Sequence, residues 1–456
     1  MHIHILGACG TFMGGVALLA KRAGHRVSGS DQHTYPPMST QLEAEGIELF
    51  EGYSPEHLDP TPDLVIIGNA LSRGNPAIEY VLNQNMNYTS GPRWLGENYL
   101  RGKSVIAVAG THGKTTTSSM VAWILEKAGL EPGFLIGGVP HDFGYSARDG
   151  KQFFVVEADE YDTAFFDKRA KFVHYRPQIA ILNNLEYDHA DIYPNLQSIQ
   201  IQVHHLVRTI PGNGTIISNG LDQNLESVLE QGCWSQLQRF SLGEEASDWQ
   251  VEMIKPGGRE LRISRGGEAL GNLSWDLQGR HNAMNACASI AASVAAGVTP
   301  ASAIEALASF RGVKRRMETV AEIDGIRVYD DFAHHPTAIR LTLEGLRRNI
   351  SNARLLVALE SRSNTMQAGI HNDELGPALV AADRVWLKAG EGINWDPQQA
   401  LAPLEGRGRV VTRTADLLQQ MKDSVRSGDH VVFMSNGGFD AAPRRFCDLL
   451  KDHESG

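Results

Sequence analysis

The segment Gly110–Thr116, with the sequence Gly-Thr-His-Gly-Lys-Thr-Thr, restricts the possible folds of this chain more than any other feature. It follows Ser104–Ala109, an apolar run typical of a buried strand, and it precedes a long helical stretch. A glycine-rich turn between a strand and a helix lets backbone N–H groups approach phosphate oxygens, and the helix N-terminus favours negative charge. The segment therefore predicts a nucleotide-phosphate loop within an α/β sheet.

The residue types in this loop suit ATP and Mg²⁺. Lys114 would reach the β- and γ-phosphates, and the Thr115 hydroxyl would bind the ion. The loop is a variant, because the strict Walker pattern has a glycine where Val108 stands. The alternative is a tight glycine turn with an exposed lysine, which the strand–loop–helix context disfavours. The expected ATP-binding residues of the loop are Gly110, Thr111, His112, Gly113, Lys114, Thr115 and Thr116.

Length and composition limit the classes of protein to consider. At 456 residues, and with about 150 residues per domain, the chain is expected to form three domains. The net charge of −11 disfavours nucleic acid as a partner, and the apolar runs are shorter than the roughly 20 residues of a membrane span. The chain start lacks a basic signal-peptide region, and the four scattered cysteines favour a reducing cytoplasm. Nothing here indicates the oligomeric state.

Strand-like and helical stretches alternate along the chain, which predicts α/β domains with doubly wound, mostly parallel sheets. Residues 1–102 begin with a strand, Ile3–Leu6, followed by a glycine turn and a helix. Residues 103–315 contain the phosphate loop, and residues 316–456 again alternate strands and helices. We expect domain boundaries near residues 102 and 315. Short β-like segments within the middle unit are Thr215–Ile217, Val251–Ile254, Leu261–Ser264 and Leu273–Leu277.

Acidic and amide side chains follow two further strands of the middle unit. Glu157–Glu160 comes after the apolar run Phe153–Val156, and Asn183–Asp191 comes after Ile179–Leu182. The carboxyl ends of strands are where α/β folds place functional groups, and a carboxylate there could bind Mg²⁺. Taken singly, the first segment is equally well a solvated acidic turn, and a lone His189 is more often structural than a ligand.

These motifs resemble those of the Mur ligases, which form amide bonds through acyl phosphates. The variant phosphate loop is similar to theirs and to that of folylpolyglutamate synthetase, and the resemblance covers essentially the whole chain. It implies an α/β, three-domain Mur ligase architecture: a Rossmann-like UDP-binding domain at residues 1–102, a central P-loop ATPase domain at 103–315 and a C-terminal Rossmann-like domain at 316–456. It also implies an ATP-dependent ligase that requires ATP and Mg²⁺.

The resemblance assigns roles to residues around ATP. In Mur ligases a Glu after one central strand and an Asp-His after the next bind magnesium, which implies that Glu157 bridges two ions and His189 binds the second. The segment Gly279–Asn285 resembles the one that meets the adenine end of ATP, although Asn282 alone is also a plausible helix cap. The implied metal ligands are Thr115, Glu157 and His189, the implied catalytic residues are Lys114, Glu157, His189 and Arg316, and the further ATP-binding residues are Asn282, Asn285, Arg316 and Asp331.

The amino-terminal glycine turn has two possible nucleotide partners. The turn has the spacing Gly-x-x-Gly-x-x-x-Gly, and Asp31 at the end of the second strand could bind a ribose hydroxyl, as in a nicotinamide-dependent dehydrogenase. A hydride-transfer enzyme needs neither a second phosphate loop nor a paired metal site. We therefore favour the use that Mur ligases make of this turn, which is to hold the diphosphate of a UDP-sugar. The expected UDP-sugar-binding residues are Gly7, Gly10, Thr11 and Asp31.

Several strings resemble one branch of the family, the murein peptide ligases. They are Gly10–Gly15, Asp159–Asp162 and Met434–Phe439. This resemblance implies the substrates UDP-N-acetylmuramate and the wall tripeptide L-alanyl-γ-D-glutamyl-meso-diaminopimelate, in peptidoglycan recycling; the alternative is a UDP-N-acetylmuramate–L-alanine ligase. The branch usually has a proline where Ser361 stands. Because strand ends meet in one crevice, we expect a peptide-binding site at the ends of two C-terminal strands, formed by Arg362, Asn364, Ser435 and Asn436.

Overall fold

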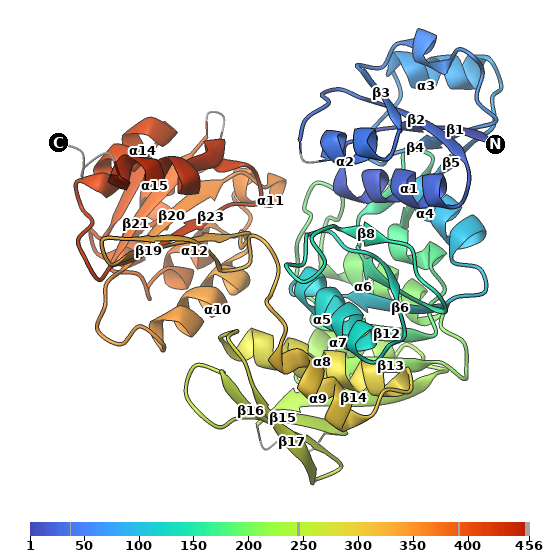
Figure 1. Cartoon of the computed structure of the whole chain (residues 1–456). Coiled ribbons are helices and arrows are strands. Elements are labelled where there is room, and N and C mark those ends of the chain that lie inside the picture. Colours follow the sequence, from blue (N-terminus) through green and yellow to red (C-terminus); the bar gives the residue numbers. More distant parts are fainter. Residues whose placement is uncertain (37, 244–246, 391–392, 452–456) are drawn as a thin grey trace.

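The computed structural model describes residues 1–36, 38–243, 247–390 and 393–451. Three main β-sheets follow one another along the chain, each with helices packed on it (Figure 1). The predicted boundaries near residues 102 and 315 lie between these sheets and stay predictions. Among the described residues, no helix is both long enough and apolar enough to cross a membrane.

The amino-terminal sheet has five parallel strands in the order β3-β2-β1-β4-β5. The glycine turn follows its central strand, β1, and opens helix α1, which buries residues 13–20. Asn75 caps α3 through its side-chain oxygen, and Pro76 occupies the first turn, where its missing N–H costs nothing. The elements are β1 (His2–Leu6), α1 (Thr11–Arg22), β2 (Arg26–Asp31), α2 (Met38–Ala44), β3 (Glu48–Glu51), η1 (Pro55–Leu58), β4 (Leu64–Ile67), α3 (Pro76–Asn83), β5 (Tyr88–Ser90), α4 (Gly91–Trp94) and η2 (Leu95–Tyr99).

The central sheet has ten strands in the order β17-β16-β15-β14-β13-β12-β6-β9-β7-β8. The run from β14 to β7 is parallel, so the carboxyl ends of β6, β9 and β12 meet at one edge, as the sequence predicts. The elements are β6 (Ser104–Ala109), α5 (Lys114–Lys127), β7 (Gly133–Leu135), β8 (Ala147–Arg148), β9 (Phe153–Ala158), β10 (Asp162–Ala164), β11 (Asp167–Ala170), η3 (Lys171–His174), β12 (Ile179–Leu182), α6 (Leu196–Val207), β13 (Thr215–Asn219), α7 (Gln223–Leu229), β14 (Gln236–Leu242), β15 (Trp249–Met253), β16 (Glu260–Arg265), β17 (Glu268–Ser274), α8 (Arg280–Ala295) and α9 (Pro300–Ala308).

The third sheet has six strands in the order β18-β19-β23-β20-β21-β22, parallel except for β18. β20 is buried along its whole length because helices cover both faces of this sheet. The elements are β18 (Glu318–Ile323), β19 (Ile326–Asp331), α10 (Pro336–Arg347), β20 (Leu355–Ser361), α11 (Asn364–Gln367), α12 (Asn372–Ala378), β21 (Arg384–Ala389), α13 (Pro397–Ala400), η4 (Ala402–Leu404), β22 (Gly408–Val411), α14 (Thr414–Lys422), β23 (His430–Met434), η5 (Phe439–Ala441) and α15 (Ala442–Lys451).

Two strands of the central sheet differ from the sequence pattern. β14 is not predicted, because most of its side chains are polar and only partly buried. β17 begins at Glu268 and ends at Ser274, earlier than the apolar run 273–277 indicates. The reason is the Gly266-Gly267 turn, where both residues have positive φ and the chain reverses from β16 into β17.

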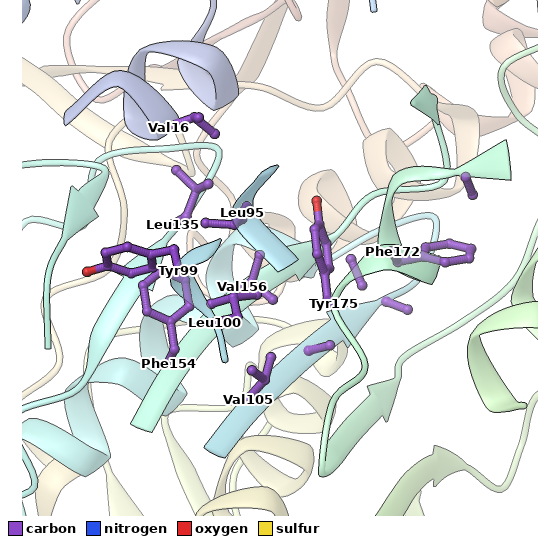
Figure 2. Close-up of a cluster of buried hydrophobic side chains, with 14 of the residues drawn as sticks. Val16, Leu95, Tyr99, Leu100, Val105, Leu135, Phe154, Val156, Phe172 and Tyr175 are labelled. Carbon is purple, nitrogen blue, oxygen red and sulfur yellow. The ribbon is translucent and has the colours of Figure 1, made fainter. Parts of the chain in front are cut away.

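The amino-terminal and central domains share one hydrophobic core. Val16 of α1, Leu95 and Tyr99 of η2, and Leu135 and Phe154 of the central sheet belong to the same buried cluster (Figure 2). Close approach of α1 requires a glycine, because a Cβ on Gly15 would lie 2.1 Å from Cδ1 of Leu135. These two domains are therefore packed together as a unit.

The C-terminal domain has its own buried clusters and meets the central domain through polar contacts. Thr365 Oγ1 donates to Asp188 Oδ1 at 2.8 Å, and Asn364 Nδ2 donates to Asp191 Oδ2 at 2.9 Å. The chain passes between the two domains through a linker that follows α9 (Figure 1).

One buried histidine of the first sheet makes the fold sensitive to acid. His4 of β1 is fully buried, and its ring nitrogens lie 2.9 Å from Ser28 Oγ and 3.0 Å from Ser30 Oγ. Burial, reinforced by the neighbouring His2 and His57, lowers the pKa of His4 to about 3. The unfolded chain therefore takes up a proton below about pH 6.5 that the folded chain does not, so stability falls as the pH falls from 6.5 toward 3.

We expect the low pKa of His4 to make the free energy of unfolding about 2 kcal/mol smaller at pH 5 than at pH 7. Thermal unfolding of wild type and His4→Gln between pH 5 and 8 measures it. The wild-type midpoint should fall more steeply below pH 6.5 than that of His4→Gln. His33→Gln, at a side chain that is 73% exposed, is the matched control and should follow wild type. Equal slopes for wild type and His4→Gln would contradict the assignment.

Candidate active site

The predicted phosphate loop lies between β6 and α5, as expected. Gly113, at φ 80°, caps the helix, and no side chain of the described residues bonds to the cap, which leaves the first N–H groups of α5 available to phosphate. The segment after β12 braces the loop from one side: the His112 N–H donates to Asn184 Oδ1 at 2.8 Å, and the Thr111 N–H donates to the Asn184 carbonyl at 3.2 Å. Thr115 and Thr116 are buried in the first turn.

The loop lysine is paired with an acid from the neighbouring strand end. Lys114 Nζ donates to Glu160 Oε2 at 2.9 Å and to the Gly110 carbonyl at 2.7 Å. Burial opposes the charge of Lys114, but Glu160 and Asp159 outweigh it and raise its pKa. Burial likewise opposes the charge of Glu160, but Lys114 and His189 lower its pKa. Both groups are therefore charged at neutral pH.

His189 belongs to the same group of charges. Its Nε2 lies 3.1 Å from Glu160 Oε1, and its pKa is raised because that hydrogen bond and the charges of Glu160 and Asp188 outweigh burial. One ligand atom from each of Asp159, Glu160 and His189 lies within 4.8 Å of the others. Two carboxylates and an imidazole so placed can hold a divalent cation. The structure thus brings His189 to Asp159 and Glu160.

Glu157, near the end of β9, contacts Thr115 of the phosphate loop. Its Oε1 accepts the Gly137 N–H at 2.6 Å, and burial raises the pKa of its carboxyl, although Lys114, Thr115 and Arg316 favour the ionised form. Arg316 Nη2 reaches Thr115 Oγ1 at 3.3 Å. The predicted residues Thr115, Glu157 and Arg316 are therefore brought together.

The two amides of α8 differ in place. Asn285 is buried beside the phosphate loop: its Oδ1 accepts from Asn183 Nδ2 at 3.3 Å, and a Cβ on Gly113 would lie 2.7 Å from it. Asn282 Nδ2 donates locally to the Gln278 carbonyl at 2.7 Å. Gly279 is the N-cap of α8, and no side chain among the described residues caps this helix, so the alternative of Asn282 as a helix cap is not confirmed.

Asp331 is fully engaged by the backbone. Its two carboxylate oxygens accept the N–H groups of Met317 and Ala333 at 2.7 and 2.8 Å. Burial raises the pKa of Asp331, while Arg316 and these N–H groups act in the opposite direction. In this structure Asp331 holds the linker beside Arg316.

The amino-terminal turn leaves its first helical residues accessible. Gly10 is the N-cap of α1 and provides no side-chain acceptor, and Gly10 and Thr11 are exposed. Gly7 has φ 86°, a conformation suited to glycine. Asp31 Oδ2 accepts the Cys9 N–H at 2.7 Å, so this carboxylate supports the turn.

The four candidate peptide-binding residues lie in two environments. Ser435 is buried and its hydroxyl donates to Glu360 Oε2 at 2.6 Å, and Asn436 Oδ1 is buried without a hydrogen-bond partner among the described residues. Arg362 is exposed, and its guanidinium lies against Gly437. Asn364 is instead tied across the domain junction to Asp191.

Comparison with known proteins identifies the family. Three family models match: "Mur ligase family, catalytic domain" over residues 2–102, "Mur ligase middle domain" over 108–293 and "Mur ligase, glutamate ligase domain" over 315–437. The UDP-N-acetylmuramate–L-alanyl-γ-D-glutamyl-meso-2,6-diaminoheptandioate ligase of Escherichia coli (strain K12) is 50% identical over 456 residues, which cover 99% of this chain and 98% of that protein. The chain is a Mur ligase. Members of this family are ATP-dependent ligases, and this chain has their three-domain architecture.

Two solved Mur ligase structures show that similarity in fold and similarity in sequence rank these relatives differently. A murein peptide ligase from Psychrobacter arcticus 273-4 is 45% identical with a TM-score of 0.77, over 99% of this chain and 98% of that one. A UDP-N-acetylmuramate-alanine ligase from Thermotoga maritima is only 25% identical but has a TM-score of 0.82, over 99% and 100%. Overall shape therefore does not distinguish these two branches, and sequence identity does.

Several residues at this Mur ligase site were not singled out by the sequence. Glu160 is the direct partner of both Lys114 and His189, yet it lies beyond the end of β9 in an acidic run that offered three candidates. Asp188 and Thr365 join two domains across 177 positions. A sequence pattern does not indicate a contact between two residues so far apart in the chain. The acidic run 157–160, in contrast, does indicate a group of carboxylates at the end of a strand.

Lys114→Ala and Glu157→Ala are each expected to lower the rate of ligation by at least about two orders of magnitude, the scale of lost electrostatic stabilisation in a transition state. Coupled release of ADP measures the rate. Lys127→Ala is the matched control, because Lys127 is exposed at the other end of the same helix. Near-normal turnover of either folded site variant would remove that residue from the ATP site.

Proposed function

We propose that this Mur ligase joins L-alanyl-γ-D-glutamyl-meso-diaminopimelate to UDP-N-acetylmuramate with the hydrolysis of ATP to ADP and phosphate, as in peptidoglycan recycling. The observation that carries the proposal is 50% identity, over nearly the full length of both chains, to the Escherichia coli ligase named for this tripeptide. The alanine ligase from Thermotoga maritima is half as similar in sequence.

The reaction proceeds in two chemical steps. An oxygen of the muramate carboxylate attacks the γ-phosphorus of ATP, the bond to the β,γ-bridging oxygen breaks, and ADP leaves. The peptide amine then attacks the carbonyl carbon of the acyl phosphate. The tetrahedral intermediate expels phosphate with the electron pair of the C–O bond, and the amine nitrogen loses its proton. The product is an amide.

The cations at the phosphate loop are suited to the first step. Negative charge on the transferring phosphoryl group requires positive charge close by, and Lys114 and Arg316, which both contact residues of the loop, would supply it. The first N–H groups of α5 add the positive end of the helix dipole. Asn285 lies beside Gly113 and is suited to the nucleotide; Asn282 and Asp331 would join it after local rearrangement.

Mg²⁺ is the expected second cofactor, and the donor set fits it. Thr115 is hydrogen-bonded to Glu157, Asp159 and Glu160 form a second group with His189, and the three carboxylates all lie close enough to Lys114 to raise its pKa. The carboxylate and hydroxyl oxygens of this set are ligands of the kind that Mg²⁺ prefers, and His189 adds an imidazole nitrogen. When bound, the ion would neutralise charge on the phosphates. We assign Thr115, Glu157 and His189 to it, with Glu160 as an additional candidate ligand.

The UDP-sugar is assigned to the amino-terminal turn. A diphosphate accepts hydrogen bonds from N–H groups and is stabilised by the positive end of a helix dipole. The open N-terminus of α1, with Gly7, Gly10 and Thr11, offers both. Asp31 would act by supporting this turn. Because the first two domains share a core, a sugar held at α1 and a nucleotide held at α5 keep a fixed separation. The substrates, ATP and a UDP-sugar, and the four free cysteines favour the cytoplasm as the place of reaction.

The peptide is assigned to the ends of β20 and β23. A tripeptide brings carboxylates that an arginine fork can bind and N–H donors that a buried amide oxygen can accept. Arg362 offers the arginine fork, and Asn436 offers the buried amide oxygen. Ser435, the residue before Asn436, donates a hydrogen bond to Glu360. Asn364 lies farther out, at the junction with Asp191. Free L-alanine would leave much of this polar site unpaired.

We expect kcat/KM to be higher for the tripeptide than for free L-alanine, and Arg362→Ala to reduce kcat/KM for the tripeptide about tenfold or more, as for a lost charged hydrogen bond. Steady-state ligation with both amines measures this. Arg413→Ala, at an arginine of the same domain whose side chain is 75% exposed, is the control and should behave as wild type. A preference for alanine would make the alanine ligase the better description.

The competing dehydrogenase interpretation predicts binding of a nicotinamide cofactor. Our proposal predicts that the intact protein binds UDP-N-acetylmuramate and does not bind NAD. Isothermal titration calorimetry with each ligand separates the two. Heat of binding from NAD, with none from the UDP-sugar, would refute the assignment of the amino-terminal turn.

A further inference from the structure

Two neighbouring arginines in the linker between the central and C-terminal domains reach different sites. Arg316 Nη2 lies 3.3 Å from Thr115 Oγ1 in the phosphate loop. Arg315 instead reaches the C-terminal domain, where its Nη2 donates to the carbonyl oxygens of Ser435 and Gly437 at 2.7 and 2.6 Å. One dipeptide therefore contacts both the ATP site and the segment assigned to the peptide.

The backbone of this linker is held in an uncommon conformation. Arg315 has φ 58° and Met317 has φ 51°, in the left-handed region that residues other than glycine seldom adopt. The Arg315 N–H donates to Glu318 Oε2 at 2.8 Å, and the Met317 N–H donates to Asp331 Oδ2 at 2.7 Å. Such a conformation persists only where surrounding contacts fix it. The linker thus sets the directions in which the two arginines leave it.

The Arg315 side chain is fixed along its length. Its Nε donates to Asp330 Oδ2 at 3.2 Å, and its guanidinium carbon lies 5.3 Å from the centre of the Phe332 ring. The guanidinium of Arg316 lies 4.7 Å from the same ring, so Phe332 contacts both cations. A planar guanidinium can donate to a carboxylate and to two carbonyl groups at once, whereas a lysine ammonium cannot reproduce that geometry.

Segment 435–437 in turn supports Arg362. Ser435 Oγ donates to Glu360 Oε2 and accepts the Gly437 N–H at 2.9 Å, which closes a tight turn. A Cβ on Gly437 would lie 2.3 Å from Nη1 of Arg362, so the Arg362 guanidinium rests directly on this glycine. Asn436, between them, presents the buried Oδ1 that has no partner among the described residues. The shape of this turn therefore decides where both candidate peptide-binding groups stand.

We propose that Arg315 is a positioning residue for the peptide substrate. By holding the carbonyl groups of Ser435 and Gly437, it fixes segment 435–437, and with it Arg362, against the linker that also contacts the phosphate loop. The proposal rests on the proposed function, because it concerns the tripeptide of that reaction. The peptide site is complete only in the linker conformation in which Arg316 reaches Thr115.

Steady-state ligation by Arg315→Ala and Arg315→Lys tests this. In Arg315→Ala, KM for the tripeptide should rise about tenfold or more, since two charged hydrogen bonds to the segment are lost. The KM values for ATP and UDP-N-acetylmuramate, and kcat, should change by less than about twofold, because transition-state interactions at the phosphate loop are retained. Arg315→Lys keeps the charge without the fork and should recover only part of the loss.

A second readout separates peptide positioning from a general structural role. Isotope exchange within ATP, measured with UDP-N-acetylmuramate and without tripeptide, reports phosphoryl transfer alone. Arg315→Ala should exchange at the wild-type rate. If exchange falls as much as ligation does, Arg315 serves the ATP site or the fold as a whole, and the proposal is overturned. An unchanged KM for the tripeptide overturns it as well.

Two further variants keep the test decisive. Arg311→Ala is the matched control, because Arg311 makes similar bonds to Asp142 and to the His141 carbonyl, but within the central domain; its kinetics should be those of wild type. Gly437→Ala leaves the carbonyl contacts of Arg315 in place and displaces Arg362, so it should raise KM for the tripeptide even if Arg315→Ala does not fold. A normal KM there refutes the proposal. Failure of wild type to ligate the tripeptide would instead refute the proposed function itself.

Discussion

The pairing of buried carboxylates with cations at the carboxyl end of β9 is the constraint on which the rest of the site depends. Glu160 is buried and Asp159 is partly buried, with 29% of its side chain exposed, and an unpaired buried charge is strongly destabilising. Lys114 and His189 meet Glu160, and Lys171 meets Asp159. The phosphate loop, the segment after β12 and the start of η3 are therefore all fixed by one group of charges.

A nucleotide bound at the loop as proposed would change this balance. Phosphate oxygens compete with Glu160 for the ammonium of Lys114, and a carboxylate released in this way becomes available to a cation. With ATP at the loop as proposed, the nucleotide would replace this ion pair, and the half-buried Arg316, 3.3 Å from Thr115 Oγ1, is already in place for it. The phosphates would then pair with Lys114 in place of Glu160, so that no buried charge is left unpaired.

The sequence predicts those parts of the site that local pattern controls. An apolar strand, glycines and a helix define the phosphate loop, and parallel order places the ends of β9 and β12 on either side of β6. It does not predict which acid meets which cation, since β9 ends at Ala158 and the turn beyond it decides that Glu160 faces Lys114. It also does not predict the direction of the Arg315 side chain, because that direction depends on two linker residues with left-handed backbone conformation. Nor does it predict β14, because the many polar side chains of this strand do not give the apolar pattern typical of a buried strand.

The unequal way in which the domains are joined has a consequence for the order of events in catalysis. Apolar surface buried between α1 and the central sheet is costly to expose, so the amino-terminal and central domains stay together through a catalytic cycle. The hydrogen bonds that join Asn364 and Thr365 to the central domain can exchange for water at little net cost. The C-terminal domain is then the one that can swing away. With the substrates placed as proposed, its motion would gate amine entry and product release, while the acyl donor and the nucleotide would meet on a surface that is always assembled.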